Sequence, residues 1–506
     1  MVDLCIHDKH YLLTHITLWA IHFSHRRYYI YTMRLFLLFY IILAVFSSGY
    51  SQKVTVSKEM PLKSDVAYDL LGQVGENVLL YRNRGNDKHR VEVFDKEMAF
   101  VKEREITFEK KRVDVLGVIP RDSTFNMIYS YREDGDIIHR IRRYRGNMII
   151  EDSTELFRIP KTFKSKNFLL ETSENKKFSI LFAFEDKHRM DFYVIRHDSL
   201  DILEKKIFEV VDMDMRDKFR NVVLTNRGEI LILVEQKNSR FSKDDNHFGL
   251  FQMDVGTNVK YTRINNYEKV VGDIDIDFDN VNRRVCIVGL WHDKHKDAAK
   301  GYFYLNKPAI TLKEVEEFTV TSFTPELIAE ANTKDIGKSS ELKDYKLNQL
   351  ALRRDGGFLL FAESQREYSR SSNRQSGFGN RGFSGWMDHF FEEVVVIAVQ
   401  PDDREHWSRV LFKKQFSQDD DAIFSSYFLM KTPSRLKLIF NDEIKNNNTV
   451  SEYLLDPIGR FNRNSLLSTD YQNLKIRFAD AVQVSGSEFI APSEKNRKLS
   501  LVKIAY

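Results

Sequence analysis

The stretch that decides the fold is VVLTNRGEILILVE, residues 222–235. An apolar run, Val222–Leu224, precedes the polar turn Asn226-Arg227-Gly228, and a strongly apolar run, Ile230–Val234, follows it. Apolar runs on both sides of an Asn/Gly turn predict two antiparallel strands joined by a hairpin. A third expected strand, Phe248–Val255, follows after a longer polar segment.

The same unit recurs from Gln52 to the end of the chain. Each copy has a short apolar strand, a polar turn, a strongly apolar second strand, an alternating third strand and a more polar fourth strand. The expected second and third strands are Val78–Tyr81 with Arg90–Phe94, Phe125–Tyr131 with Ile137–Tyr144, Phe178–Phe184 with Met190–His197, Glu229–Glu235 with Phe248–Val255, Arg284–Leu290 with Tyr302–Leu305, Gly357–Ala362 with Glu393–Val399, Arg435–Phe440 with Ser451–Leu455, and Glu488–Ala491 with Leu499–Ile504.

The spacing of these eight copies indicates the architecture. Successive copies begin about 50 residues apart, and four-stranded units of about 40–50 residues are typical of propeller blades. A single blade would leave an apolar face in water, and stacking blades around an axis buries it. We therefore expect an all-β fold, an eight-bladed β-propeller over residues 52–506, with seven blades as the alternative count. A short helix is expected in the connection Pro325–Lys346.

The two ends of the repeat predict how the ring closes. The chain ends in the third strand of its eighth copy, Leu499–Ile504, while Lys53–Ser57 stands alone ahead of the first copy. We expect this N-terminal strand to complete the last blade, because closure removes a free sheet edge.

The chain resembles β-propeller proteins in general over residues 52–506, and it looks like a secreted propeller of Gram-negative bacteria. The resemblance is architectural. No Trp-Asp dipeptide closes each copy, and the paired glycines of kelch repeats are missing. The resemblance therefore implies a fold and no active site.

The N-terminus predicts export. Residues 35–46 read LFLLFYIILAVF, an uncharged apolar run that follows Arg34. A membrane-spanning helix needs about 20 apolar residues, so this shorter run is typical of a signal peptide. Gly49 and Ser51 are small residues suited to cleavage, which we expect after Ser51.

The predicted signal peptide therefore covers residues 33–51, with Met33 as the initiator and residues 1–32 as an upstream extension. We expect the mature chain to be periplasmic or extracellular, with no stable membrane span after cleavage. An uncleaved N-terminal anchor is the alternative.

Charge balance and cysteine content argue against nucleic-acid binding and against a disulfide. The chain has 77 basic and 73 acidic residues, a formal charge of +4, and this near balance argues against nucleic-acid binding. Cys5 precedes the predicted cleavage site, so Cys286 has no partner for an intramolecular disulfide. Cys286 lies in the apolar run Val285–Val288, where a buried, unreactive thiol is expected.

The insertions predict one face richer in loops than the other. In a propeller, the connections between second and third strands share a face with the links between blades. We call this the loop-rich face and its opposite the turn face. The insertions on the loop-rich face are Gln236–His247, Trp291–Lys300, Ser364–Glu392, Asn441–Thr449 and, between blades, Thr319–Tyr345. Long loops on a rigid scaffold often carry recognition, so we expect the ligand there.

The segment Ser364–Glu392 is the most unusual insertion. Its candidate ligand-binding residues are Arg366, Tyr368, Arg370 and Trp386, within a stretch rich in Arg, aromatic residues and Gly. Such a mixture can bind a nucleic-acid strand, a glycan or an acidic polymer through charge and stacking. The predicted export makes nucleic acid the least expected of the three. The alternative is a solvated loop without a ligand.

Two insertions place Trp beside His and Asp. They contain Trp291-His292-Asp293 with His295, and Trp386-Met387-Asp388-His389, in neighbouring blades where the two sets could converge. Sugar stacking on the two tryptophans needs fewer coincidences than a metal site. No Cys pair and no helical His-x-x-x-His supports a metal, so no metal or cofactor is predicted.

Alternating carboxylates form a last candidate. Asp273, Asp275 and Asp277 alternate with apolar residues, as do Asp212 and Asp214. On a strand this places the carboxylates on one side. A Ca²⁺ site in the channel is one interpretation. A wet strand that faces the channel or enters a blade is the interpretation we favour.

The sequence contains no His-Glu-x-x-His, P-loop or Gly-x-Ser-x-Gly motif. We therefore expect a non-catalytic binding or scaffold propeller of the periplasm or cell surface. Its partner would be a glycan, an acidic polymer or another envelope protein. The alternative is a secreted glycan-acting hydrolase or lyase that uses carboxylates on the same face.

Overall fold

The computed structural model describes residues 52–506 except 64, 86–87, 162–166, 211–213, 240–244, 257, 267–268, 293–297, 333–339, 372–384, 443–448 and 468–473. The predicted signal peptide, residues 33–51, and residues 1–32 lie outside the described part. In that part, no helix is long and apolar enough to cross a membrane.

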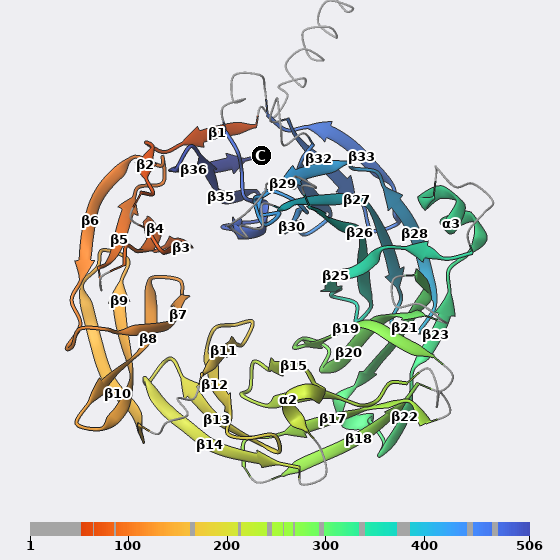
Figure 1. Ribbon diagram of the computed structural model, residues 1–506, viewed down its shortest axis with the longest axis horizontal. Helices are drawn as coiled ribbons and strands as arrows, with labels where there is room; N and C mark the ends of the chain where they lie inside the picture. Colours follow the sequence, from red (N-terminus) through yellow and green to blue (C-terminus); the bar gives the residue numbers. More distant parts are fainter. Residues whose placement is uncertain are drawn as a thin grey trace, which may run out of the picture. The chain divides into compact units, whose positions relative to one another are not determined.

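Residues Val54–Ala505 fold into eight sheets, which Figure 1 shows arranged in a ring. Each sheet has four or five strands. In the first seven sheets the first strand along the chain lies innermost, whereas in the eighth the N-terminal strand Lys53–Val56 lies at the outer edge. The chain is thus an all-β, eight-bladed β-propeller, as the repeat predicted, and the alternative count of seven blades is wrong.

The strands of the first four blades are β3 (Ala67–Val74), β4 (Asn77–Asn83), β5 (His89–Phe94) and β6 (Phe100–Ile106); β7 (Asp114–Pro120), β8 (Thr124–Glu133), β9 (Asp136–Arg145) and β10 (Ile150–Pro160); β11 (Leu169–Thr172), β12 (Phe178–Phe184), β13 (Arg189–Arg196) and β14 (Asp201–Glu209); β15 (Phe219–Leu224), β16 (Ile230–Lys237), β17 (His247–Met253) and β18 (Val259–Asn265), with β22 (Val315–Glu317) added. The last four blades contain β19 (Val270–Asp279), β20 (Arg284–His292), β21 (Ala298–Pro308) and β23 (Thr319–Ser322), with β24 (Leu342–Lys343); β25 (Tyr345–Leu352), β26 (Phe358–Ser371), β27 (Gly385–Val399) and β28 (Glu405–Leu411), with β29 (Gln415–Gln418); β30 (Phe428–Lys431), β31 (Leu436–Asn441), β32 (Val450–Leu455) and β33 (Phe461–Ser465); β34 (Val482–Gln483), β35 (Glu488–Lys495), β36 (Lys498–Ala505) and β1 (Lys53–Val56), with β2 (Met60–Pro61).

The hairpin predicted at residues 222–235 is present as β15 and β16. Its turn is closed by the Thr225 amide, which donates to the Glu229 carbonyl at 2.9 Å. Gly228 has a φ of 86°, a left-handed conformation that glycine adopts without steric penalty.

The core lies between neighbouring blades, and this explains why the second strands are apolar throughout. Ile230 and Ile232 of β16 pack with Ile180 of the third blade. Leu231 and Leu233 of the same strand face the fifth blade. A strand buried on both faces reads as a continuous apolar run. Burying each Leu or Ile contributes roughly 1.5–3 kcal/mol, so stacking of the blades stabilises the ring.

The N-terminal strand closes the ring as predicted. In the eighth blade, β1 lies beside β36. The Ser57 amide donates to the Leu501 carbonyl at 2.9 Å, and the Leu501 amide donates to Ser57 Oγ at 2.8 Å. Farther along, Met60 of β2 pairs with Leu499 and is buried between the eighth and first blades.

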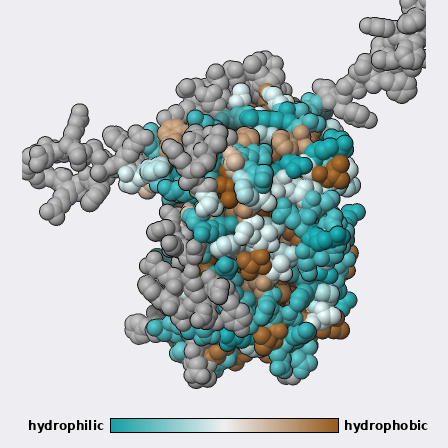
Figure 2. All heavy atoms as spheres, turned by 90° about the vertical axis from the view of Figure 1, so that its right-hand side faces the viewer, coloured by the Kyte–Doolittle hydropathy of each residue, from teal (hydrophilic) through white to brown (hydrophobic). Residues whose placement is uncertain are grey.

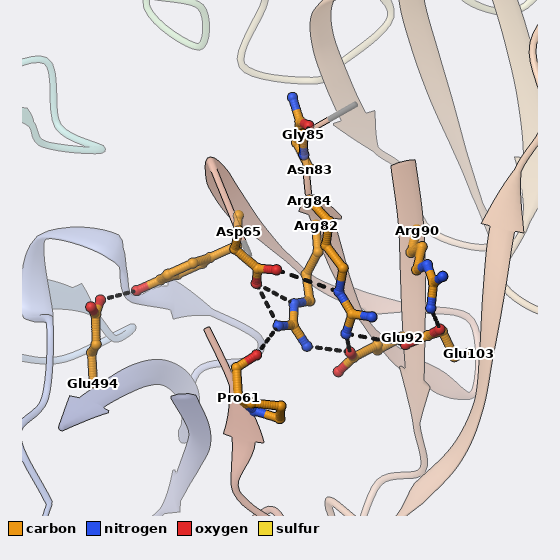
Figure 3. Close-up of polar contacts among 11 residues, drawn as sticks. Pro61, Asp65, Arg82, Asn83, Arg84, Gly85, Arg90, Glu92, Glu103 and Glu494 are labelled. Atoms are coloured by element: carbon orange, nitrogen blue, oxygen red, sulfur yellow. Dashed lines mark hydrogen bonds and ion pairs between the residues drawn. The ribbon is translucent and has the colours of Figure 1, made fainter. Parts of the chain in front are cut away.

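A buried arginine then ties the N-terminal segment to the first blade (Figure 3). Arg82 of β4 has no exposed surface. Its guanidinium donates to Asp65 Oδ2 at 2.6 Å, to Glu92 Oε1 at 2.5 Å and to the Pro61 carbonyl at 2.5 Å. One side chain on β4 therefore holds both the end of β2 and the segment that follows it.

Two local predictions have opposite outcomes. The short helix in Pro325–Lys346 is confirmed as α3 (Pro325–Ala331), which Thr324 caps by accepting from the Leu327 amide. The strand interpretation of Asp214 is wrong: Asp214 caps the helix α2 (Met215–Lys218) by accepting from the Asp217 amide. Asp212 lies outside the described residues.

The expected loop Ser364–Glu392 is wrong for most of its described length. Strand β26 continues to Ser371 and β27 begins at Gly385, so the segment extends the hairpin of the sixth blade. Strand β29 adds to β27 along Asp388–Phe391. Likewise β20 continues through His292, and only residues 293–297 of the Trp291–Lys300 insertion lie outside the described part.

The hydrophilic surface and the burial of Cys286 agree with the expectations from composition and sequence. Figure 2 shows a wall that is mainly hydrophilic, with scattered apolar side chains. Cys286 is fully buried, as the sequence predicted, and burial raises its pKa well above the ordinary value.

Candidate ligand site

A cavity of about 500 Å³ lies between the first residues of three inner strands. Its lining comprises Arg220 of β15, Gly272–Asp275 of β19, and Leu347 and Asn348 of β25. Each of these strands is entered from the link between blades, so the cavity lies on the inner side of the ring at the loop-rich face. We call it the inner-strand cavity.

Arg220 supplies the positive charge of the cavity. Its Nε donates to Glu235 Oε2 at 3.0 Å, and its Nη2 contacts the same oxygen. Glu235 is on β16, so the ion pair joins two strands of one blade. The pair fixes the direction of the Arg220 side chain while leaving it exposed at the cavity.

Two carboxylates of β19 form the acceptor side. Asp273 Oδ2 accepts from the Leu347 amide at 3.1 Å, which links the fifth and sixth blades. Asp275 Oδ1 accepts from Asn221 Nδ2 at 2.8 Å, which links the fifth and fourth blades. Burial raises the pKa of Asp275 above its ordinary range. These contacts hold both carboxylates in place before any ligand arrives.

The alternating carboxylates thus lie on an inner strand, as the favoured interpretation expected. Asp277 continues the row, and burial raises its pKa to about 6, opposed by the charge of Lys431. The charge of Asp277 in turn raises the pKa of Glu171 on β11, after the larger effect of burial. In the part of the chain that is described, no group of three or more His, Cys, Asp or Glu residues could hold a metal ion. The Ca²⁺ interpretation therefore has no described ligand set.

Asn348 connects the cavity to a buried ion pair. Its amide donates to Glu363 Oε2 at 2.6 Å. Glu363 also pairs with Lys413 at 2.6 Å, and both side chains are almost completely buried. Burial lowers the pKa of Lys413, and the charge of Glu363 opposes that shift. The Glu363–Lys413 ion pair is closed off from solvent, and its contact with Asn348 fixes the position of that side chain at the cavity.

The wall of the inner-strand cavity explains the position of His292, one of the ligand-binding residues predicted from the sequence. A Cβ atom at Gly272 would lie 2.2 Å from His292 Nε2, so only glycine fits in front of this imidazole. His292 is 2% exposed and therefore packs behind the wall. Trp291 is also buried, its indole N–H donating to the Thr321 carbonyl at 3.0 Å. Neither side chain reaches solvent as an insertion residue would.

The remaining candidates share the β26–β27 hairpin. Arg366 forms an ion pair with Glu392 and lies over the Phe390 ring, 5.7 Å from its centroid. Tyr368 is exposed and meets the same ring edge-on at 5.8 Å. The hairpin therefore brings Arg366 and Tyr368 together around Phe390.

Asp388 and His389 lie on the opposite strand of this hairpin and are buried. Asp388 accepts from Gln418 Nε2 at 3.1 Å, and His389 Nδ1 lies 3.6 Å from Glu367. Arg370 pairs in register with Trp386. Asp388 thus contacts Gln418, whereas Trp291 contacts Thr321. Asp293 and His295 lie outside the described residues.

Sequence reasoning missed Arg220, Asn348, Glu363 and Lys413. Glu363 carried a usable signal, because it follows the apolar run Phe358–Ala362 directly and a charge there must be paired. Arg220 and Asn348 carried none, since polar residues at the start of inner strands are common along this chain.

Comparisons with known proteins show the fold alone. No family model and no curated protein matches the chain. Similar solved structures include the β-propeller domain of the Trilobed protease from Pyrococcus furiosus, at 9% identity and a TM-score of 0.37 over 82% of this chain and 99% of that one. The β-propeller domain of Vanderwaltozyma polyspora Nup133 has 9% identity and a TM-score of 0.40 over 91% and 98% of the two chains. Polysaccharide lyase Uly1 has 8% identity and a TM-score of 0.38 over 89% and 99%. Likenesses this distant carry no argument about ligand or activity.

Proposed function

We propose that this chain is a non-catalytic binding propeller that holds a neutral, hydroxyl-rich glycan in the inner-strand cavity. The observation that carries the proposal is the lining: Asp273, Asp275 and the amide oxygen of Asn348 offer acceptors, while the guanidinium of Arg220 offers donors. Sugar hydroxyls both donate and accept, so fixed groups of both kinds suit them.

The charge of the cavity separates the three partner classes expected from the sequence. The carboxylates of Asp273, Asp275 and Asp277 follow one another along β19, and Arg220 is already paired with Glu235. An acidic polymer would meet this row with like charge. A protein partner would bury more surface than a cavity of about 500 Å³ offers. A neutral glycan meets neither obstacle.

Calorimetric titration of the full chain with neutral oligosaccharides tests the proposal. Asp275→Asn and Arg220→Ala should each weaken binding about tenfold, the effect of losing one charged hydrogen bond. Arg435→Ala, on the turn face, is the matched control and should bind as the parent does. Saccharide binding that both cavity variants leave unchanged would contradict the proposal.

The glycan-acting enzyme remains a second candidate because Asp275 and Asp277, next to each other on one side of β19, both have raised pKa values. A carboxyl whose pKa is raised toward neutral pH can serve as a general acid. Release of reducing ends or unsaturated products from a polysaccharide, lost in Asp277→Asn, would favour the enzyme over the binding protein.

We further propose export to the periplasm or cell surface, supported by the apolar run at residues 35–46.

A further inference from the structure

A second cavity, of about 600 Å³, opens on the turn face. It lies among the β25–β26 turn, the β30–β31 turn and the β32–β33 turn, with Gln483 and Gly486 of the eighth blade at its side. We call it the turn-face pocket. It belongs to the sixth, seventh and eighth blades, whereas the inner-strand cavity belongs to the fourth, fifth and sixth.

The floor of the turn-face pocket is apolar. Its lining residues include Leu359, Trp407, Pro433, Leu436, Leu455 and Pro457. The indole N–H of Trp407 donates to the Pro457 carbonyl at 3.0 Å, so the indole offers a ligand its ring rather than its donor. Ile458, next to Pro457, is 52% exposed at the tip of the same turn. Sugar hydroxyls would find few partners on such a floor.

The rim of the turn-face pocket is cationic. Arg353 and Asp355 pair with each other, and Asp456 pairs with Arg460. Arg354 and Arg435, on two different turns, are exposed and have no carboxylate within 4.0 Å among the described residues. Within the described part of the chain, two guanidinium groups that lack a carboxylate partner therefore border an apolar pocket whose acidic residues are already paired.

We propose that the turn-face pocket binds an acidic peptide segment of a partner protein. An apolar side chain of the segment would occupy the floor beside Trp407, and flanking carboxylates would pair with Arg354 and Arg435. A volume of about 600 Å³ holds two or three side chains. Guanidinium groups bind carboxylates with two parallel hydrogen bonds, which gives direction as well as charge to the contact.

Fluorescence anisotropy of the full chain with a labelled hexapeptide, one phenylalanine flanked by glutamates, tests this proposal. Versions flanked by lysines, or with serine in place of phenylalanine, are the probe controls. We expect a Kd below about 1 mM at low salt for the first peptide alone. Arg354→Ala and Arg435→Ala should each weaken it about tenfold, and salt should weaken it further.

Arg158→Ala is the matched variant control, because Arg158 is an exposed arginine of β10 in the second blade. It should leave peptide binding unchanged. Trp407→Phe should remove a change in tryptophan emission on binding while Arg435→Ala reduces its affinity. Equal binding of the lysine peptide, or no binding of the glutamate peptide, would overturn the proposal. Laurate that displaces the peptide and binds more tightly would assign the pocket to a fatty acid instead. Saccharide binding at the inner-strand cavity is independent of all these outcomes.

Discussion

Replacing Arg82 with methionine should loosen the closure of the ring. Arg82 is fully buried, and it is the donor for Asp65, Glu92 and the Pro61 carbonyl. Methionine preserves much of the apolar stem and removes every one of these hydrogen bonds. The two carboxylates would then remain in a site from which water is excluded (Figure 3).

The size of the effect follows from that burial. Removing one partner of a buried ion pair costs roughly 3–5 kcal/mol, because the remaining charge is uncompensated. An unfolding entropy of about 2.1 cal/mol/K per residue, over roughly 450 residues from Val54 to Ala505, gives about 0.9 kcal/mol/K. The Tm should therefore fall by about 3–5 °C. Arg90→Met is the control, since Arg90 pairs with Glu103 nearer the surface and should lose under about 1 kcal/mol.

The pH dependence of this loss has a definite sign. Burial already raises the pKa of Glu92, and the charge of Arg82 opposes that shift. Without Arg82 the folded-state pKa rises further above the unfolded value. Such a carboxyl destabilises the fold above its folded pKa and ceases to do so as it becomes protonated. The difference in Tm between Arg82→Met and the parent should therefore be smaller at pH 5 than at pH 8.

Differential scanning calorimetry measures the stability, and hydrogen exchange at the Leu501 amide reports the closure. Arg82→Met should accelerate exchange at Leu501, because Pro61 and Asp65 no longer hold the segment that follows β1. A variant that melts within about 1 °C of the parent, with Leu501 exchange unchanged, would refute the reasoning. A large loss of Tm without faster exchange would place the effect in the first blade instead.

Two further predictions concern buried polar groups. Lys413→Met should lower the free energy of urea unfolding by about 3–5 kcal/mol by leaving the buried charge of Glu363 uncompensated, and adding Glu363→Gln should restore much of that loss. No recovery in the double variant would contradict the pairing. His197 bonds through Nδ1 to Asn126 at 2.9 Å, and burial lowers its pKa to about 4. Because the unfolded value is near 6.5, its contribution is present above that pH and falls by about 2 kcal/mol between pH 7.5 and 5. Urea titrations of His197→Gln should show a flatter pH dependence than the parent, whereas exposed His406→Gln should not.

The number of blades and the closure could be predicted because packing imposes both on the sequence. The alternate residues of β16, Ile230 and Leu231, face different neighbouring blades, so the whole strand must be apolar and is easy to recognise. The lone strand Lys53–Ser57 was equally visible, since one blade lacked its outer strand. These features depend on local periodicity, which a single sequence records.

The inner-strand cavity could not be predicted, because its lining comes from three blades. Asn221 and Asp275 are 54 positions apart, and no local pattern marks that they meet. The strands of the β26–β27 hairpin were not predicted for another reason. Tyr368 and Met387 are exposed, while Asp388, which follows Met387 and pairs with Tyr368, is buried. Apolar and polar residues therefore do not alternate in the way that identifies a strand. Composition rich in Arg, Ser and Gly then favoured a loop.

Stability alone does not account for the acidic residues along β19. Burial raises the pKa of both Asp275 and Asp277, so each ionised carboxylate lowers the stability of the fold at neutral pH. An asparagine at Asp275 would keep an acceptor for the Asn221 amide without that penalty. Groups that cost stability where an equivalent neutral residue is available are typical of binding and catalytic sites. The inner ends of these blades, rather than the exposed hairpin that first attracts notice in the sequence, are therefore where the energetics of this propeller indicate function.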